Sequence, residues 1–343
     1  MVEAIPVGGT SDPIVPARAK PARWTPAATV IAMATVLVIV IWAIFLLLCW
    51  QGFGTTLENA KAKAQGAADV VAGETTWMLG GAHAILAQLA ASAPLPADIT
   101  AQQKAILDAA LKPLAATTSL GIYDAAGTAW ADASSPSLPQ NIADEDFFKV
   151  LEAGGDWTVS PQRNDAATGA PVFVVAQRLG GAEFGGIATL TIGVDVFRSF
   201  WEPQKLGQDS TVSLARIDGW LVGRYPPLPK ALDLSTSPVF APGSADIGSY
   251  VSESSPADGM ARIVAFHKLP QLGVVAIASI GQRAVFAPLW SAILIVTALI
   301  GPISIMLLVF AFVIARMLRQ SARTQASLAA ALDHNGVLFR EIH

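Results

Sequence analysis

The chain has 343 residues, of which 53% are hydrophobic and only 14% are charged, and its formal net charge is −4. This composition is too apolar for an ordinary soluble domain and predicts that part of the chain lies in lipid. No block of Lys or Arg occurs, which argues against a nucleic-acid partner because binding to phosphates needs clustered positive charge.

The first apolar run covers residues 27–50 and contains no charged residue. Roughly 20 apolar residues are enough for a helix to cross a bilayer, and the run is longer than the apolar part of a cleaved signal peptide. We therefore predict an uncleaved transmembrane helix, preceded by a disordered cytoplasmic tail over residues 1–26. Cys49, the single cysteine, excludes an internal disulfide and is interpreted as a small hydrophobe.

The second apolar run covers residues 285–315 and predicts a second transmembrane helix. Pro288, Gly301 and Pro302 within it indicate a tilted or kinked helix. Six basic residues flank the two runs: Arg18, Lys20 and Arg23 before the first, and Arg316, Arg319 and Arg323 after the second. The positive-inside rule then places both termini in the cytoplasm and residues 51–284 outside it.

Between the runs, residues 57–90 are rich in Ala and lack Pro, and Val71, Met78 and Ile85 recur at seven-residue spacing. This pattern predicts a long amphipathic stalk helix. Its apolar stripe suits packing on its own domain and pairing with a second subunit equally well. A second helix is expected over residues 101–114.

Strand-turn-strand patterns occupy much of the remaining outer segment. Residues 119–134 and residues 211–226 each combine two β-rich runs with a turn that contains Asp and Gly, and residues 261–280 form a further hairpin before the second apolar run. A short helix is expected over residues 143–155. Together these elements predict an α+β fold in which an antiparallel sheet has helices against one face.

This order of elements resembles the double-Cache, or tandem PAS-like, sensor domains of bacterial receptors. The resemblance rests on the stalk helix, the hairpin over residues 122–130, the helix start at Asp146-Phe147-Phe148, the Thr168-Gly169 turn before Pro171-Val172-Phe173, and the strand end at Gly193-Val194-Asp195. It implies two modules, a membrane-distal one over residues 100–206 and a smaller proximal one over residues 207–283.

The resemblance also places the signal molecule in the distal module, in a pocket between the sheet and a covering loop. Aromatic and polar residues that could line such a pocket are Tyr123, Trp157, Arg163, Phe173, Gln177, Arg178 and Asp195. Structural alternatives are a sheet core for the aromatic side chains, a solvated surface for the arginines, and the cap of a helix over residues 196–201 for Asp195. An arginine in the pocket would favour a carboxylate or another anion.

The final residues, 338–343, resemble the start of the phosphoacceptor box of HWE-like sensor histidine kinases. The resemblance implies that His343, or a histidine directly after it, accepts phosphate and that Glu341 hydrogen-bonds the imidazole. We expect ATP and Mg²⁺ only on a kinase domain outside these residues, so whether the chain itself is an enzyme stays open. The alternative is an ordinary helix end in a cytoplasmic coiled-coil linker over residues 316–343.

The function that follows is a transmembrane receptor of a two-component system. We expect a homodimer that contacts membrane lipid, binds a small extracytoplasmic ligand, holds no cofactor or metal, and reaches a response regulator through the kinase part. Three alternatives share the same outer and membrane segments: the sensor region of a diguanylate cyclase, that of a chemoreceptor, and a stand-alone membrane binding protein that partners a separate transducer.

Overall fold

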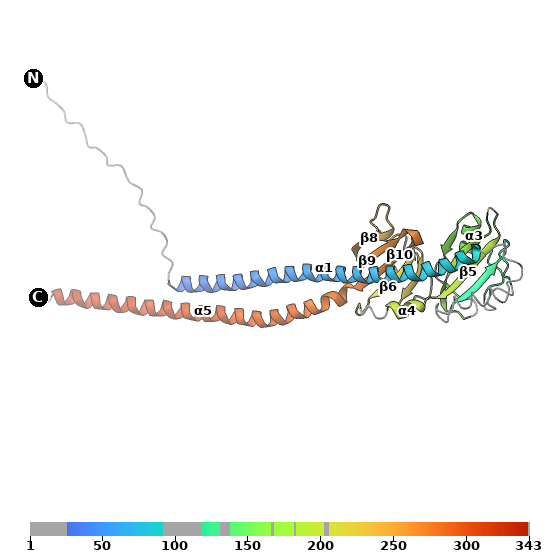
Figure 1. The fold of residues 1–343 in the computed structure, drawn as a ribbon. Coiled ribbons are helices and arrows are strands. Elements are labelled where there is room, and N and C mark those ends of the chain that lie inside the picture. Colours follow the sequence, from blue (N-terminus) through green and yellow to red (C-terminus); the bar gives the residue numbers. More distant parts are fainter. Residues whose placement is uncertain are drawn as a thin grey trace, which may run out of the picture. The chain divides into compact units, whose positions relative to one another are not determined.

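Two long helices flank two antiparallel sheets in the chain (Figure 1). The computed structural model describes residues 26–91, 118–130, 138–165, 168–181, 183–201 and 206–341. The long helices are α1 (Pro26–Ala91) and α5 (Gln282–Glu341). The helix expected over residues 101–114 lies outside the described residues, as does His343.

The two predicted stretches at the start of the chain, residues 27–50 and 57–90, form one continuous helix. The residues between them include no proline, so nothing there removes a helical N–H donor. The second apolar run is likewise part of one helix that continues to Glu341. The predicted stalk helix is therefore confirmed, with the difference that it has no boundary with the apolar run.

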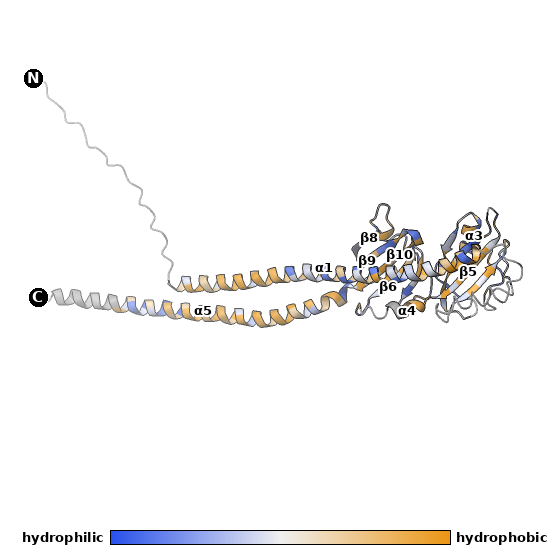
Figure 2. Ribbon diagram, in the orientation of Figure 1, coloured by the Kyte–Doolittle hydropathy of each residue, from blue (hydrophilic) through white to orange (hydrophobic). Residues whose placement is uncertain are grey.

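The chain divides into two compact units, residues 50–292 with both sheets, and residues up to 49 together with those from 293. In the second unit α1 and α5 are strongly apolar (Figure 2), and their most apolar windows have mean hydropathies of 3.0 and 2.7. The indole N–H of Trp42 donates to Ser304 Oγ at 3.3 Å. Two helices of this length and composition fit a two-pass membrane protein.

The first sheet forms the core of the distal module and follows the order β1-β5-β4-β2, with β3 also paired to β4. All its pairings are antiparallel. Helix α3 (Asp146–Glu152) covers one face, within the range expected for a short helix. The strands are β1 (Ser119–Tyr123), β2 (Trp157–Val159), β3 (Arg163–Asn164), β4 (Pro171–Leu179) and β5 (Gly186–Gly193).

The second sheet forms the core of the proximal module and follows the order β7-β6-β10-β9-β8, again antiparallel. Helix α4 (Val196–Trp201) precedes it, and the short helices η2 (Pro238–Phe240) and η3 (Pro270–Leu272) lie in its connections. The strands are β6 (Thr211–Arg216), β7 (Leu221–Tyr225), β8 (Ile247–Ser252), β9 (Arg262–Leu269) and β10 (Val274–Gly281).

The predicted hairpins over residues 211–226 and 261–280 are confirmed as β6-β7 and β9-β10. In the hairpin predicted over residues 119–134, Ala129 forms an antiparallel bridge with Tyr123, and the N–H of Trp130 donates to the carbonyl oxygen of Ile122 at 2.9 Å. The described part of this hairpin is therefore confirmed, and residues 131–134 lie outside the described residues. The carboxylate of Asp124 accepts the backbone N–H groups of Ala126 and Thr128 at 2.9 and 2.8 Å, and Gly127 has a φ of 77°. This tight turn reverses the chain into the bridge between Tyr123 and Ala129, and Thr128 forms a further bridge with Asn141.

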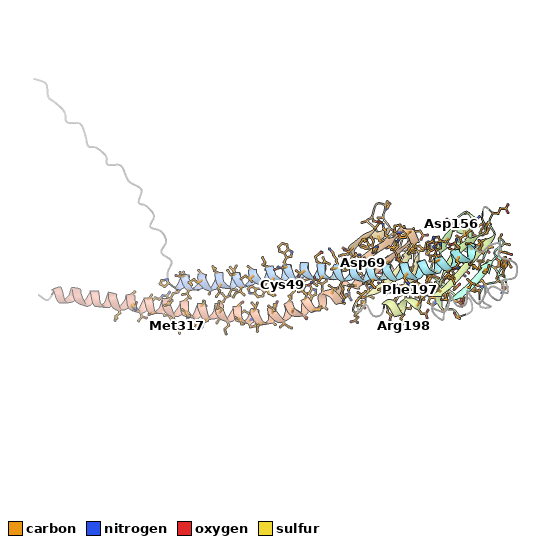
Figure 3. The ribbon with its side chains drawn as sticks, in the orientation of Figure 1. Cys49, Asp69, Asp156, Phe197, Arg198 and Met317 are labelled. Carbon is orange, nitrogen blue, oxygen red and sulfur yellow. The ribbon has the colours of Figure 1, made fainter. Side chains whose placement is uncertain are left out.

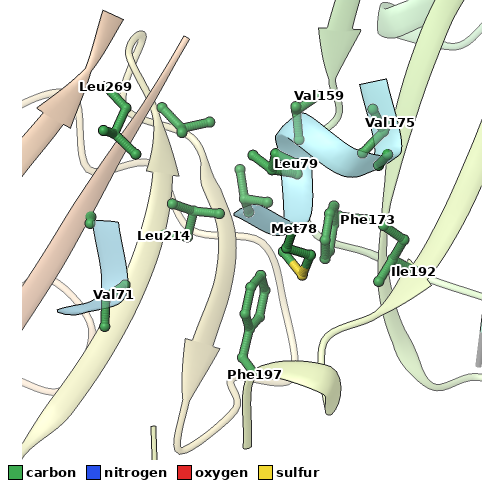
Figure 4. Packing of buried hydrophobic residues seen from close by; sticks show 14 of the residues in the cluster. Val71, Met78, Leu79, Val159, Phe173, Val175, Ile192, Phe197, Leu214 and Leu269 are labelled. Carbon is green, nitrogen blue, oxygen red and sulfur yellow. The ribbon is translucent and has the colours of Figure 1, made fainter. Parts of the chain in front are cut away.

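The main core lies where the later half of α1 packs on both sheets, with Val71, Met78 and Leu79 buried against it (Figure 4). Alanines along the same face let the helix approach the strands closely. Asp69, labelled in Figure 3, also binds His267 Nδ1 on β9 at 2.9 Å. The apolar stripe of the stalk therefore packs on its own domain, while pairing with a second subunit stays a prediction.

Candidate functional site

Each sheet has one face against α1 and the other face under a covering segment. This segment lies within residues 138–152, which include α3, for the first sheet, and is residues 232–239 for the second. Side chains alternate along a strand, so odd-numbered and even-numbered residues of β4 point to opposite sides. Phe173 and Val175 belong to the core around α1, whereas Val174 and Ala176 pack with α3 on the covered face. Each covered face contains a cavity.

The distal cavity lies on the covered face of the first sheet and contains two of the predicted ligand residues, Tyr123 and Arg163. Its volume is about 30 Å³, the room of a single water molecule. Its lining combines apolar walls with several polar groups: Tyr123, Leu138, Pro139, Ile142, Phe147, Arg163, Asn164, Asp165, Val172, Val174, Thr189 and Thr191.

Each charged side chain that lines the distal cavity has a partner. Arg163 forms an ion pair with Glu145 at 2.7 Å, and both side chains are about one-third exposed. Asp165 accepts the backbone N–H and the hydroxyl of Thr168, both at 2.8 Å, which confirms the predicted turn. Burial raises the pKa of Tyr123 to about 12, while the charge of Arg163 lowers it and that of Glu145 raises it. The phenol is thus a neutral donor at physiological pH.

The close packing around Tyr123 depends on Gly121, two residues earlier in β1. A Cβ at this position would lie 2.7 Å from Thr189 Oγ1 and 2.8 Å from the Tyr123 ring. Only glycine leaves this space, so the residue fixes how near the strands and the aromatic ring approach.

Three predicted ligand residues instead lie on the α1 face of the sheet. Phe173 is fully buried and stacks on Phe197 of α4, with ring centroids 5.5 Å apart. Trp157 stacks on His83 of α1 at 4.5 Å. Gln177 is the cross-strand partner of Trp157, and its side-chain oxygen has no hydrogen-bond partner among the described residues. These positions are separated from the cavity by the sheet itself.

The remaining two predicted ligand residues are also outside the distal cavity. Arg178 donates to the carbonyl oxygen of Leu151 at 2.7 Å, near the end of α3, and its guanidinium lies 4.9 Å from the Phe184 ring centre. Asp195 lies two residues after the end of β5, and its carbonyl oxygen accepts the N–H of Arg198 in α4. Of the residues proposed for the kinase end, Glu341 is the last residue of α5.

The covered face of the proximal module contains a larger cavity, of about 240 Å³, which the sequence analysis did not predict. It lies between the second sheet and residues 232–239, and Arg224 and Arg262 reach it from β7 and β9. The signal for it is an arginine at or next to the end of each of two buried strands, where a binding site or an ion pair explains a buried charge. A charge near a strand end is also common at the protein surface, so neither arginine alone indicated the cavity.

Comparisons with known proteins match part of the chain to a family of sensor domains. A family model described as a histidine kinase sensor domain, dCache_1_like, matches residues 194–279. The extracellular domain of rpHK1S-Z16, described as a histidine kinase, is similar with a TM-score of 0.52 at 20% identity, over 69% of this chain and 97% of that one. No curated protein matches the sequence.

Two chemoreceptor domains are similar at lower TM-scores. The ligand-binding domain of CtaA from Pseudomonas fluorescens, in complex with L-isoleucine, has a TM-score of 0.47 at 19% identity, over 67% of this chain and 95% of that one. The ligand-binding domain of PctB from Pseudomonas aeruginosa, in complex with L-glutamine, has a TM-score of 0.44 at 16% identity, over 68% and 91%. Residues 194–279 match the sensor-domain family, and the two-module fold around them agrees with a Cache sensor domain.

Proposed function

We propose that this chain is a transmembrane signal receptor of a two-component system, in which binding of a small polar molecule outside the cell changes α5 and, through it, a histidine kinase output. The proposal includes a two-pass chain with both termini in the cytoplasm, a homodimer in the bacterial inner membrane, and a response regulator reached through a kinase part. Its support is the family match together with the way in which the sensor domain joins α5.

The observation that carries the proposal is the direct junction between β10 and α5. β10 ends at Gly281 and α5 begins at Gln282, whose N–H donates to the carbonyl oxygen of Ala261 at 3.0 Å. Val285, in the first turn of α5, packs against the main core. No loop can absorb a displacement of the sheet, so a movement of β10 reaches α5.

The start of α5 also contacts α1 through aromatic rings. Phe53 of α1 lies 5.5 Å, centre to centre, from both Phe286 and Trp290 of α5. A shift of β10 would therefore change how α5 packs on a helix that itself holds both modules together.

The distal cavity is the proposed signal site, because it brings together two residues of the predicted set, Tyr123 and Arg163. Arg163 offers a guanidinium for a carboxylate, Asp165 a carboxylate for an ammonium group, and Tyr123 a neutral hydroxyl. This combination favours a small zwitterion such as an amino acid. Since the cavity now has room for one water, binding requires the segment that covers it, within residues 138–152, to move outward. This movement would pass to the sheet.

The experiment combines binding with transmission. We would measure the thermal shift of the purified full chain with each standard amino acid, and repeat it for Arg163→Gln. We expect Arg163→Gln to remove the shift, while Arg178→Gln, the same change at an arginine outside the cavity, retains it. A shift retained in Arg163→Gln would contradict the assignment of the site.

Transmission would be followed in membranes with a single cysteine at Ser321→Cys on α5, in a Cys49→Ala background. The active amino acid should change the rate at which two copies cross-link at this position. An unchanged rate, with ligand bound, would contradict a receptor that signals through α5.

A further inference from the structure

We propose that the proximal module holds a second ligand site, separate from the distal cavity, in which the buried guanidiniums of Arg224 and Arg262 bind the carboxylate of a small organic acid. The two arginines lie on β7 and β9, and both line the 240 Å³ cavity on the covered face of the second sheet. This site does not depend on the signal site proposed above.

The first argument is an imbalance of charge in a buried place. Arg224 is 8% exposed and Arg262 is 3% exposed. Both donate to the same oxygen of one carboxylate, Asp258 Oδ2, at 3.2 and 2.6 Å. Two buried cations thus share one anion, and the remaining positive charge is costly to bury unless another anion joins them.

The second argument is a donor without a partner. Nε of Arg262 is buried and has no hydrogen-bond partner among the described residues. The Nη1 atom of the same guanidinium donates to the carbonyl oxygen of Asp209 and is 3.4 Å from Ser279 Oγ. A guanidinium presents its donors in a planar fork that fits a carboxylate, so an acid group would satisfy the free N–H.

Burial also acts on Arg224 itself. Desolvation lowers the pKa of Arg224 from its usual value, Asp258 raises it, and the neighbouring charge of Arg262 lowers it. A second anion beside the pair would favour the charged form of both side chains, so ligand binding would relieve the cost that the empty arrangement carries.

The rest of the cavity defines the class of acid. Same-face positions of the strands supply hydroxyl groups from Thr211, Ser213 and Ser279, and Thr211 Oγ1 lies 2.7 Å from Ser279 Oγ. Apolar walls come from the sheet and from the covering segment: Leu221, Leu232, Leu234, Val239, Val264 and Ile277. A volume of about 240 Å³ admits an acid of a few carbons. We infer a short monocarboxylate, with a hydroxyl group on its chain as the preferred form.

Asp258 occupies the arginines in the absence of ligand and would compete with it. Asp258 lies between β8 and β9, its side chain is 22% exposed, and its segment is held by turns at Ser255 and Gly259. The aspartate therefore comes from the solvent side of the cavity and is able to leave, whereas the arginines are fixed in the sheet.

The test uses the full chain in detergent, titrated calorimetrically with butyrate and 2-hydroxybutyrate at constant ionic strength. We expect binding of both acids, with the hydroxy acid tighter. Arg224→Met should weaken binding by about tenfold or more, because one of the two guanidiniums is lost. Asp258→Asn should tighten it by about tenfold, because the competing carboxylate is neutralised.

Two controls separate this site from the rest of the molecule. Arg216→Gln removes an arginine of the same sheet that pairs with Asp218 outside the cavity, and should leave acid binding unchanged. Arg178→Gln, in the distal module and outside both cavities, should also leave it unchanged, and neither control depends on the signal-site proposal. The inference is overturned if neither acid binds to wild type or to Asp258→Asn, or if Arg216→Gln weakens binding as much as Arg224→Met.

Discussion

At the scale of single residues, close packing around Tyr123 fixes the shape of the covered face of the distal module. Tyr123 is 2% exposed, and the position two residues before it must be glycine for the ring to fit. Gly121 therefore sets how close the ring of Tyr123 lies to the strands beside the distal cavity.

Gly121→Ala should lower the free energy of unfolding by about 1–3 kcal/mol, because the added methyl group overpacks three neighbouring side chains. The matched change Gly73→Ala on α1, exposed and with nothing within 4 Å of the new methyl, should raise it by about 0.5–1 kcal/mol. Thermal unfolding of the two variants beside wild type checks both signs. Equal effects from the two changes would contradict the packing described around Tyr123.

The buried phenol predicts a dependence of stability on alkaline pH. The pKa of Tyr123 is raised by burial from 10.0 to about 12. A raised folded-state pKa contributes stability that is complete below the unfolded value and is lost as pH rises through the folded value, so stability should fall between about pH 10 and 12. Denaturation across this range should show a shallower fall for Tyr123→Phe than for wild type. Identical slopes would mean that the phenol ionises as easily in the folded protein as in the unfolded one.

At the scale of elements, α1 is both a stalk and a core helix. Its residues Leu79 and Leu86 are fully buried between the sheets and the helix, while Trp77 on the opposite side is 68% exposed. The helix therefore contributes to the stability of both modules through one face only.

Leu79→Ala should lower the free energy of unfolding by about 2–5 kcal/mol, because the substitution leaves a cavity in the shared core. Trp77→Ala removes a larger side chain but should change the free energy by less than about 0.5 kcal/mol. Urea unfolding followed by circular dichroism measures both. A large loss for Trp77→Ala would show that this face is covered in the native protein, for instance by a second copy.

Elements were more predictable than the site. The long helices and two hairpins follow from periodicity and turn residues that lie close together in the sequence. The turn after β1 was also predictable, because Asp124 and Gly127 are typical turn residues and both act in the turn. Phe173 and Val174 are neighbours in sequence yet lie on opposite faces of the sheet, so the register that separates core from cavity was needed to sort the candidates.

The proximal cavity could not be assembled from the sequence at all. Arg224 and Arg262 belong to strands that are not neighbours in the sheet, and only their common partner Asp258 brings their charges together. No pattern of residues close together in the sequence predicts that Arg224 and Arg262 come together. The alternation of side chains within each strand is such a local pattern and could be predicted.

At the scale of the whole molecule, the decisive property is which side of the membrane each part occupies. In a Cys49→Ala background, Lys230→Cys in the sensor domain should react with a membrane-impermeant maleimide on intact cells. Ser321→Cys on α5 should react only after the membrane is opened, because the positive-inside rule places it in the cytoplasm. The reverse labelling pattern would contradict the orientation proposed for the receptor.

The place of β10 in the second sheet has a mechanical consequence. β10 is a central strand, bonded to β6 on one side and to β9 on the other, and all its residues are buried. Antiparallel ladder bonds run perpendicular to the strands, so a pull along β10 loads two ladders in shear at once. A force on α5 along β10 would therefore move the whole proximal module before it could separate β10 from its two neighbouring strands.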